Sequence, residues 1–182
     1  MVAIQETRIP DAGSKDHEQT ARNLGWNLAI SGCGTGDGGG DSAGVAVGCR
    51  KHIGLGESCE DDLLPDVLKA RFTTKHVGAV CKGGFHLCSG YLHTGIGIQS
   101  KRNLDWLQAA AGVISTLSGP WILAADFNCT PQQLEATGWL KLVGGTIISP
   151  NHPTCKNRVI DFFVVSSNLA GMAVGAGGWN SC

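Results

Sequence analysis

The most constraining feature of this sequence is the stretch Trp121–Pro131, which reads W-I-L-A-A-D-F-N-C-T-P. Its first five residues form a short apolar run, which is typical of a strand buried on both faces. The end of the stretch predicts an immediate helix, with Thr130 as the N-cap and Pro131 at the first helical position. The chain therefore passes from a buried strand to a helix within a few residues, and Asp126 and Asn128 lie at that junction.

The two polar residues at this junction can be interpreted in two ways. Side chains two positions apart on a strand point in the same direction, so Asp126 and Asn128 would face one spot. A carboxylate beside a carboxamide can bind a hard metal ion, a water molecule and a phosphate oxygen. The alternative is an Asx turn, in which both side chains cap the helix that starts at Pro131. The spacing alone leaves both interpretations open.

The composition excludes several classes of protein. With 182 residues, 42% of them hydrophobic and 16% charged, the chain can bury the core of one domain and is not disordered. The formal net charge of -1 gives no strong positive field, so a nucleic-acid partner would need a local basic patch. No apolar run approaches membrane-spanning length, so we expect no membrane partner. The N-terminus lacks the features of a signal peptide, and we expect an intracellular location, nuclear or cytoplasmic.

Hydrophobic patterns predict many short strands and two helices. The clearer helix spans residues 101–117 and has the apolar stripe Leu104, Leu107, Ala111, Ile114 and Leu117. A shorter helix starts at Pro131 and closes near residue 140. Strands are expected at residues 2–4, 26–30, 43–48, 67–72, 77–81, 85–92, 121–125 and 158–166, with a loop at 144–153. Because strands and helices do not alternate, the order disfavours a doubly wound parallel sheet and predicts an α/β sandwich.

Further polar groups lie at strand ends. Glu6 follows the first strand, and Tyr91 and His93 end the strand that starts at residue 85. Tyr and His side chains can donate a proton or hydrogen-bond a phosphate, although a lone Glu or His is more often structural. Asp161 lies within a buried strand, where a carboxylate must be paired or hydrogen-bonded. It is therefore either a structural anchor or the orienting partner of a base.

A glycine-rich segment offers one further motif. Gly34, Gly36 and Gly39 fit the G-x-G-x-x-G pattern of nucleotide-binding loops. That pattern requires a helix to follow, and here the next segment is a strand. We therefore interpret the segment as a hairpin loop.

Taken together, these segments resemble the endonuclease/exonuclease/phosphatase superfamily. It comprises metal-dependent phosphoesterases such as pancreatic deoxyribonuclease, AP endonucleases and the endonuclease domains of non-LTR retroelements. The similar segments, in the family's order, are Ala3–Thr7 (the Q-E motif), Ser42–Val47 (G-G-V-A), Tyr91–His93 (the Tyr/His strand end), Ala125–Asn128 (G-D-F-N) and Arg158–Phe163 (R-x-I-D-Y-x). The resemblance implies a four-layer α/β/β/α sandwich of two mostly antiparallel sheets over residues 1–170, followed by a Gly-rich tail at 171–182.

The resemblance also implies a metal-dependent mechanism. Glu6 would bind Mg²⁺ or Mn²⁺. Asp126 would activate or position the attacking water, and Asn128 would orient the phosphate or Asp126. A phosphodiester needs its charge neutralised by metal and donors, and the water needs a base in line with the leaving oxygen.

The remaining site residues are carried over in the same way. His93 or Tyr91 would hydrogen-bond the phosphate or assist the leaving group. Asp161 would orient a catalytic histidine. Thr154, which precedes the last strand, and Arg158, at its start, would contact the substrate.

The sequence departs from the family pattern at both ends. The family has a strand with a metal-site Asn before the Q-E motif and ends in S-D-H, whose His pairs with the Asp at position 161. Neither is present, and no His follows His152, so the chain resembles a copy that is incomplete at both ends. One hypothesis is an endonuclease-like phosphodiesterase, impaired by truncation, with DNA favoured over RNA, inositol phosphates or lipids. The other is a non-catalytic remnant or binding module that keeps the sandwich.

Overall fold

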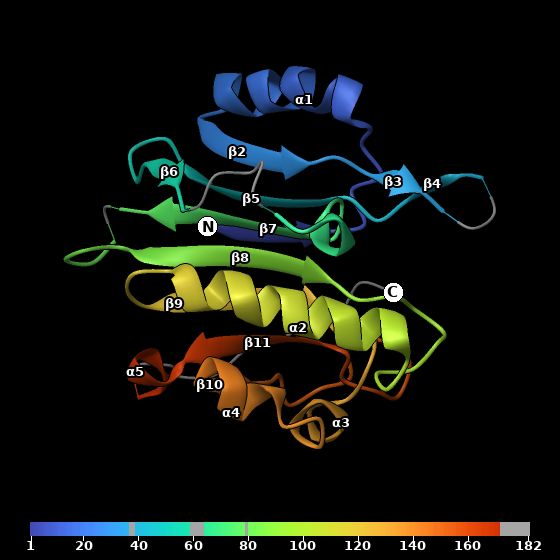
Figure 1. Ribbon diagram of the computed structural model, residues 1–182. Helices are drawn as coiled ribbons and strands as arrows, with labels where there is room; N and C mark the ends of the chain where they lie inside the picture. Colours follow the sequence, from blue (N-terminus) through green and yellow to red (C-terminus); the bar gives the residue numbers. More distant parts are fainter. Residues whose placement is uncertain (37–38, 59–63, 79, 172–182) are drawn as a thin grey trace.

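The computed structural model describes residues 1–36, 39–58, 64–78 and 80–171 (Figure 1). The strands are β1 (Val2–Gln5), β2 (Trp26–Ser31), β3 (Gly34–Thr35), β4 (Asp41–Ser42), β5 (Val45–Arg50), β6 (Leu55–Glu57), β7 (Phe72–Val77), β8 (Phe85–Tyr91), β9 (Trp121–Asp126), β10 (Gly145–Ile148) and β11 (Asp161–Ser166). The helices are α1 (Asp11–Asn23), η2 (Asp66–Leu68), α2 (Lys101–Thr116), α3 (Pro131–Glu135), α4 (Trp139–Val143) and α5 (Ser167–Ala170).

Two main sheets lie face to face. The larger sheet has the strand order β10-β11-β9-β8-β7-β6, the smaller has the order β1-β5-β2, and β3 and β4 form a separate hairpin. Strands β8 and β9 run parallel, and the other paired strands run antiparallel. The predicted mixed α/β fold with mostly antiparallel sheets is therefore confirmed. The glycine-rich segment forms the β3–β4 hairpin, as predicted.

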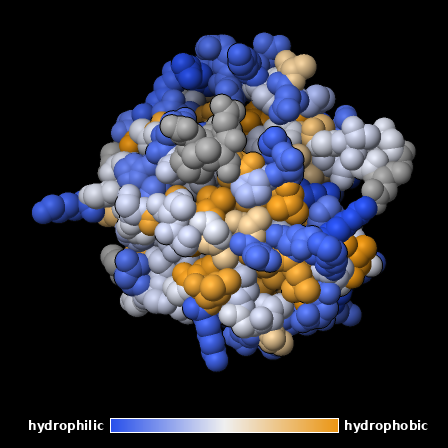
Figure 2. Space-filling view, viewed as in Figure 1, coloured by the Kyte–Doolittle hydropathy of each residue, from blue (hydrophilic) through white to orange (hydrophobic). Residues whose placement is uncertain are grey.

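Helices lie on the two outer sides of the facing sheets. α1 lies against β2 at the top of Figure 1, and α2 and α4 pack on the larger sheet. Glu18 of α1 accepts a hydrogen bond from the backbone N–H of Ile30 (3.0 Å). The helix therefore supplies an acceptor for a backbone group on the open edge of β2. In Figure 2 hydrophilic residues cover the top of the molecule, where α1 lies, and hydrophobic residues reach the surface mainly lower down. This arrangement agrees with a helix–sheet–sheet–helix layering.

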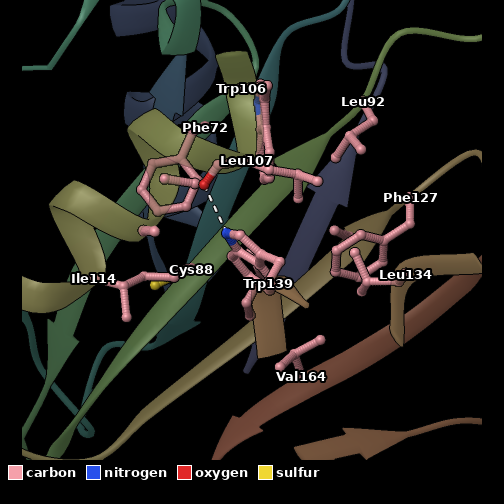
Figure 3. Packing of buried hydrophobic residues seen from close by; sticks show 14 of the residues in the cluster. Phe72, Cys88, Leu92, Trp106, Leu107, Ile114, Phe127, Leu134, Trp139 and Val164 are labelled. Carbon is pink, nitrogen blue, oxygen red and sulfur yellow. Dashed lines mark hydrogen bonds between the residues drawn. The ribbon is translucent and has the colours of Figure 1, made fainter. Parts of the chain in front are cut away.

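The main hydrophobic core lies between the larger sheet and α2 with α4 (Figure 3). The Phe127 and Phe162 rings stack with their centroids 4.3 Å apart. The Trp139 indole N–H donates to the Leu107 carbonyl at 2.6 Å, which fastens α4 to α2. A second core cluster, made of Val47, Val77, Phe85 and Leu87, fills the space between the two sheets. The two clusters fix the position of the sheets and therefore of the strand ends.

Two predicted strands are replaced by different elements. Residues 67–72 and 77–81 were expected as strands, but the structure has η2 and the single strand β7, and residue 79 lies outside the described residues. The 3₁₀ helix starts after Pro65, whose fixed φ favours a turn there. Ala70 then adopts a φ of 62°, which interrupts any strand before β7.

Three further details differ from the sequence prediction. The expected loop at 144–153 contains β10, whose β-branched residues pair with β11. The short helix after Pro131 is two helices, α3 and α4, separated at Gly138 with a φ of 75°. Leu104, predicted in the buried stripe of α2, is 38% exposed, because the buried face is centred on Trp106 and includes Asn103. No helix in the described part of the chain is long and apolar enough to cross a membrane.

Candidate active site

Three polar side chains form one row across the larger sheet, at the ends of β8, β9 and β11. Tyr91 is paired with Asp126 in the β8–β9 ladder, and Asp126 is paired with Asp161 in the β9–β11 ladder. Directly paired residues project from the same face of a sheet, so the three side chains lie together. Leu87 and Ile122, which project from this same face, pack between the sheets. The row therefore faces the smaller sheet.

Glu6 joins this row from the smaller sheet. It directly follows β1, and the Tyr91 hydroxyl donates a hydrogen bond of 2.8 Å to the Glu6 carboxylate. Arg8 lies 3.5 Å from the same carboxylate, in an exposed ion pair. Carboxylates from two sheets, at residues 6, 126 and 161, thus converge around Tyr91. The site residues predicted at these four positions are brought together by the fold.

A polar contact between the sheets positions Glu6 against the row. The Gln5 amide donates to the Ser89 hydroxyl (2.9 Å) and to the Ala124 carbonyl (3.2 Å). Ser89, which is fully buried, donates in turn to the Ile4 carbonyl at 2.9 Å. This contact joins β1 to β8 and β9 one or two residues before each strand reaches the site. Ser89 was not identified from the sequence, because only the packing of the two sheets places it opposite β1.

The backbone around the site adopts left-handed conformations at several non-glycine residues. These residues are Glu6 (φ 54°), Arg8 (φ 51°), Ala43 (φ 67°), Ala70 (φ 62°) and Asn128 (φ 51°). Such conformations are unfavourable and persist where the surrounding structure enforces them. Here the backbone N–H of Thr7 donates to the Gly44 carbonyl (3.0 Å), and that of Arg8 donates to the Ala43 carbonyl (3.1 Å). The segment that carries Glu6 is therefore held rigidly.

The junction after β9 contains the Asx turn that the sequence left open. The Asp126 carboxylate accepts the backbone N–H of Asn128 at 2.9 Å, and the Asn128 amide donates to the Leu92 carbonyl at 3.0 Å. These side chains do not cap α3. Thr130 does, in a capping box with Gln133, as the sequence predicted. Asn128 therefore orients Asp126 and ties the end of β9 to the end of β8.

Burial and neighbouring charges shift the pKa values of two residues in the row. The pKa of Asp126 is raised to about 6, first by burial and then by the charges of Asp161 and Glu6, while hydrogen bonds from Asn128 oppose the shift. Burial, followed by the hydrogen bond to Glu6, also raises the pKa of Tyr91, which keeps the phenol protonated at neutral pH. The site is therefore a group of mutually repelling carboxylates beside a permanent hydrogen-bond donor.

His93 lies just beyond the row, on a loop fixed by a buried asparagine. Its backbone N–H donates to the Asn103 side-chain oxygen (2.8 Å), and the Asn103 amide donates to the carbonyls of His93 (3.1 Å) and Gly97 (2.9 Å). The His93 side chain lines a pocket next to the row. Asn103 was missed from the sequence, although a polar residue on the apolar face of a helix was a usable signal.

Thr154 and Arg158 belong to the turn that precedes β11. The Thr154 hydroxyl accepts the backbone N–H groups of Ile160 and Asp161, both at 3.0 Å, so it positions the start of the strand. Arg158 pairs with Cys155 in a short bridge, and its side chain is exposed. Their substrate contacts stay a prediction.

The donor set suits a hard divalent cation. In the described ranges, no three His, Cys, Asp or Glu side chains are grouped closely enough to form a complete metal site. Mg²⁺ does not need one, because it usually binds through one or two carboxylates, several waters and substrate phosphates. The carboxylate oxygens of Glu6 and the row are the ligands that Mg²⁺ and Mn²⁺ prefer. The residues present therefore fit a cation that binds together with a phosphate ester.

The fold and its acidic strand-end site define a mixed α/β protein with a candidate hydrolytic centre. The sequence profile of the Endonuclease/Exonuclease/phosphatase family matches residues 1–180, and the chain belongs to this family of nuclease- and phosphatase-type hydrolases. Among curated protein sequences, none matches the chain significantly.

Solved structures share the fold at low sequence identity. An AP endonuclease from Leishmania major has a TM-score of 0.63 and 14% identity, over 95% of this chain and 71% of that one. A family member from Bacteroides thetaiotaomicron has a TM-score of 0.52 and 16% identity, over 87% of this chain and 66% of that one. A family member from Leptotrichia buccalis has a TM-score of 0.52 and 14% identity, over 82% of this chain and 63% of that one. The chain thus spans about two thirds of these structures, and the likeness shows the fold alone.

Proposed function

We propose that this protein is a Mg²⁺- or Mn²⁺-dependent phosphodiesterase acting on nucleic acid, with DNA favoured over RNA. The observation that supports the proposal most strongly is the convergence of Glu6, from one sheet, with Asp126 and Asp161, from the other. A divalent cation would reduce the repulsion between carboxylates at a strand-end edge, and the bound cation would in turn attract a phosphate. Family membership supports a hydrolase that acts on phosphate esters.

Each residue of the site has a role in this proposal. Glu6 would hold the cation, which supplies neutralisation of the phosphate charge and a more acidic water when bound. Asp126 is ionised above a pH of about 6, so at neutral pH it can accept a proton from the attacking water. Asn128 keeps Asp126 in place through its backbone N–H. Asp161 adds negative charge beside Asp126.

Hydrogen-bond donors around the carboxylates would bind the phosphate. Tyr91 keeps its proton at neutral pH and can donate to a phosphate oxygen or to the leaving group. His93 lies two residues further along, on the pocket side, and can donate to the same group. Arg158 and Thr154 lie on the turn before Asp161, where they would contact the substrate backbone.

A plasmid-nicking assay tests this function. We expect nicking of supercoiled DNA with added Mg²⁺ or Mn²⁺, loss of nicking with EDTA, and loss with Asp126→Ala. Glu135→Gln, at an exposed carboxylate on α3, is the matched control and should retain activity. Nicking that survives both EDTA and Asp126→Ala would rule the proposal out.

One observation favours a second candidate, a non-catalytic module that keeps the fold. Among the residues that the structure describes, none donates a hydrogen bond to the Asp161 carboxylate, so a base oriented by Asp161 is missing there. A non-catalytic module predicts a stable fold and no turnover with either metal. Turnover that Glu6→Gln abolishes would eliminate this candidate.

A further inference from the structure

The end of the smaller sheet that lies far from the candidate site carries a group of basic side chains. β2 starts there with Trp26, which is paired with Arg50 at the end of β5. β2 runs from left to right in Figure 1 and ends at Ser31, level with the end of β1, where Glu6 follows. At a rise of about 3.4 Å per residue, the two ends of β2 are about 17 Å apart. We call the far end the basic end; it comprises Arg22, Leu24, Trp26, Arg50, Lys51 and His52, all exposed except the half-buried Trp26.

Backbone hydrogen bonds join the two segments that form the basic end. The Lys51 N–H donates to the Gly25 carbonyl at 3.0 Å, and the Gly25 N–H donates to the Arg22 carbonyl at 3.1 Å. These bonds connect the turn after β5 to the end of α1. Leu24, the C-cap of α1, lies in the same turn and is 71% exposed. The cations of the two segments therefore belong to one surface.

Trp26 and Arg50 form a stacked pair on this surface. Ala29 and Val47 are paired in the same ladder and pack between the sheets, so Trp26 and Arg50, at odd spacing from them, project from the outer face, where α1 lies. The Arg50 guanidinium carbon lies 4.4 Å from the centre of the Trp26 ring. One face of the guanidinium thus lies on the ring, and the other is open to a planar ligand.

Nearby acidic groups do not cancel the positive charge of the basic end. The segments 22–26 and 48–53 contain no Asp or Glu, and neither do β1, β2 and β5. Within the described part of the chain, none of the three cations of the basic end forms an ion pair. Glu18, one turn earlier on α1, sets a single negative charge against them. In a chain with a net charge of -1, this surface is the kind of local basic patch that a nucleic acid needs.

We propose that the basic end binds a single-stranded stretch of nucleic acid, remote from the phosphate held at the candidate site. The inference rests on the proposed function, because it gives the nucleic-acid substrate a second contact. Arg22 and Lys51 would bind backbone phosphates, and a base would stack on the open face of the Arg50 guanidinium. A membrane matches this surface less well. Leu24 is its one large exposed apolar side chain, and binding to a lipid interface grows with the apolar area buried.

The salt dependence of binding tests the phosphate contacts. Binding of a fluorescein-labelled single-stranded oligonucleotide is followed by anisotropy in EDTA, so that no turnover and no bound metal contribute. Each phosphate contact on a single strand adds about 0.7 to the steepness of log affinity against log salt concentration. We therefore expect Lys51→Gln to reduce the steepness by about 0.7. Lys141→Gln removes an exposed cation on α4, on the larger sheet, and should leave it unchanged.

Arg50→Lys tests the stacked pair separately from charge. The variant keeps a cation but replaces the planar guanidinium by an ammonium group. The salt dependence should therefore stay as in wild type, while the affinity for the oligonucleotide falls about fivefold, the low end for stacking of one base. An unchanged affinity would contradict the stacking of a base on Arg50.

The outcomes separate this inference from the proposed function. Metal-dependent nicking of DNA, together with an unchanged salt dependence in Lys51→Gln, would overturn the second binding surface and leave the phosphodiesterase function intact. A reduced salt dependence without nicking would support the binding surface and count against the phosphodiesterase function. Vesicles that contain phosphatidylserine are the probe for a membrane. If Lys51→Gln weakens binding to these vesicles and leaves oligonucleotide binding unaffected, the surface recognises anionic lipid and the inference is wrong.

Discussion

Replacing Asp126 by Asn should stabilise the metal-free protein while it abolishes catalysis. The folded state raises the pKa of Asp126 from 3.8 to about 6, so it binds the proton more tightly than the unfolded chain does. The stability that this group contributes is therefore full below pH 4 and is lost as the pH rises through about 6. Asn resembles the protonated acid and can still accept the Asn128 N–H, so the variant should keep that stability at neutral pH.

The magnitude of this effect follows from the pKa shift. A difference between 3.8 and about 6 corresponds to about 3 kcal/mol, which partial exposure and solvent screening reduce to about 2 kcal/mol. For a chain of this length, a gain of about 2 kcal/mol raises Tm by about 4–8 °C. Urea unfolding in EDTA at pH 7.5 should show Asp126→Asn to be more stable than wild type, and unfolding at pH 4 should show the two to be nearly equal.

Glu135→Gln makes the same chemical change at an exposed carboxylate of α3 and should alter stability by less than about 0.5 kcal/mol. If Asp126→Asn is less stable than wild type at pH 7.5, burial and the neighbouring charges do not disfavour the ionised Asp126 in the folded protein. An equal gain at pH 7.5 and pH 4 would likewise refute the electrostatic explanation, because the gain must disappear when Asp126 is protonated.

Three further outcomes follow from other contacts. Thr130→Ala removes the cap of α3 and should cost about 1 kcal/mol in urea unfolding. Ser89→Ala leaves the Ile4 carbonyl without its hydrogen bond between the sheets and should lower the free energy of unfolding by about 2 kcal/mol. It should also weaken metal binding measured by calorimetry, whereas Thr130→Ala should not. Asp161→Asn removes a charge that raises the pKa of Asp126. In NMR of the metal-free protein, the carboxyl resonance of Asp126 should therefore titrate at a lower pH than in wild type. An unchanged titration would contradict this prediction.

Local sequence signals determined much of the fold. The change from apolar run to capped helix at residues 121–131 gives β9, the turn and α3 as predicted, because Thr130 and Pro131 act within a few residues. β8 and α2 also form where their apolar patterns predicted them, because these patterns are local signals too. β10 was missed because an edge strand depends on its neighbour β11 more than on its own pattern. Ala70 was missed because a left-handed alanine has no signature in sequence.

The candidate site was predictable only in part. Glu6, Tyr91, Asp126 and Asp161 each lie at or next to the end of a strand and match a motif. The strand register brings the last three together, and the packing of the two sheets adds Glu6. Ser89 holds the site through Gln5 and Ile4, which are far away in the chain, and these contacts are set by how the two sheets pack, so no spacing rule identifies them. Asn103 acts over a shorter range, on the loop that carries His93, and its polar side chain on the apolar face of α2 was the signal available in the sequence.

Crystals grown with Mn²⁺ give the most direct test of carboxylate convergence, because anomalous scattering locates the ion without any assay of activity. Convergence predicts an anomalous peak in contact with the Glu6 carboxylate, on the side facing Asp126, and its loss in Glu6→Gln. A peak elsewhere on the protein with none at Glu6, or carboxylates of residues 6 and 126 that share no cleft, would contradict the proposed metal-dependent site.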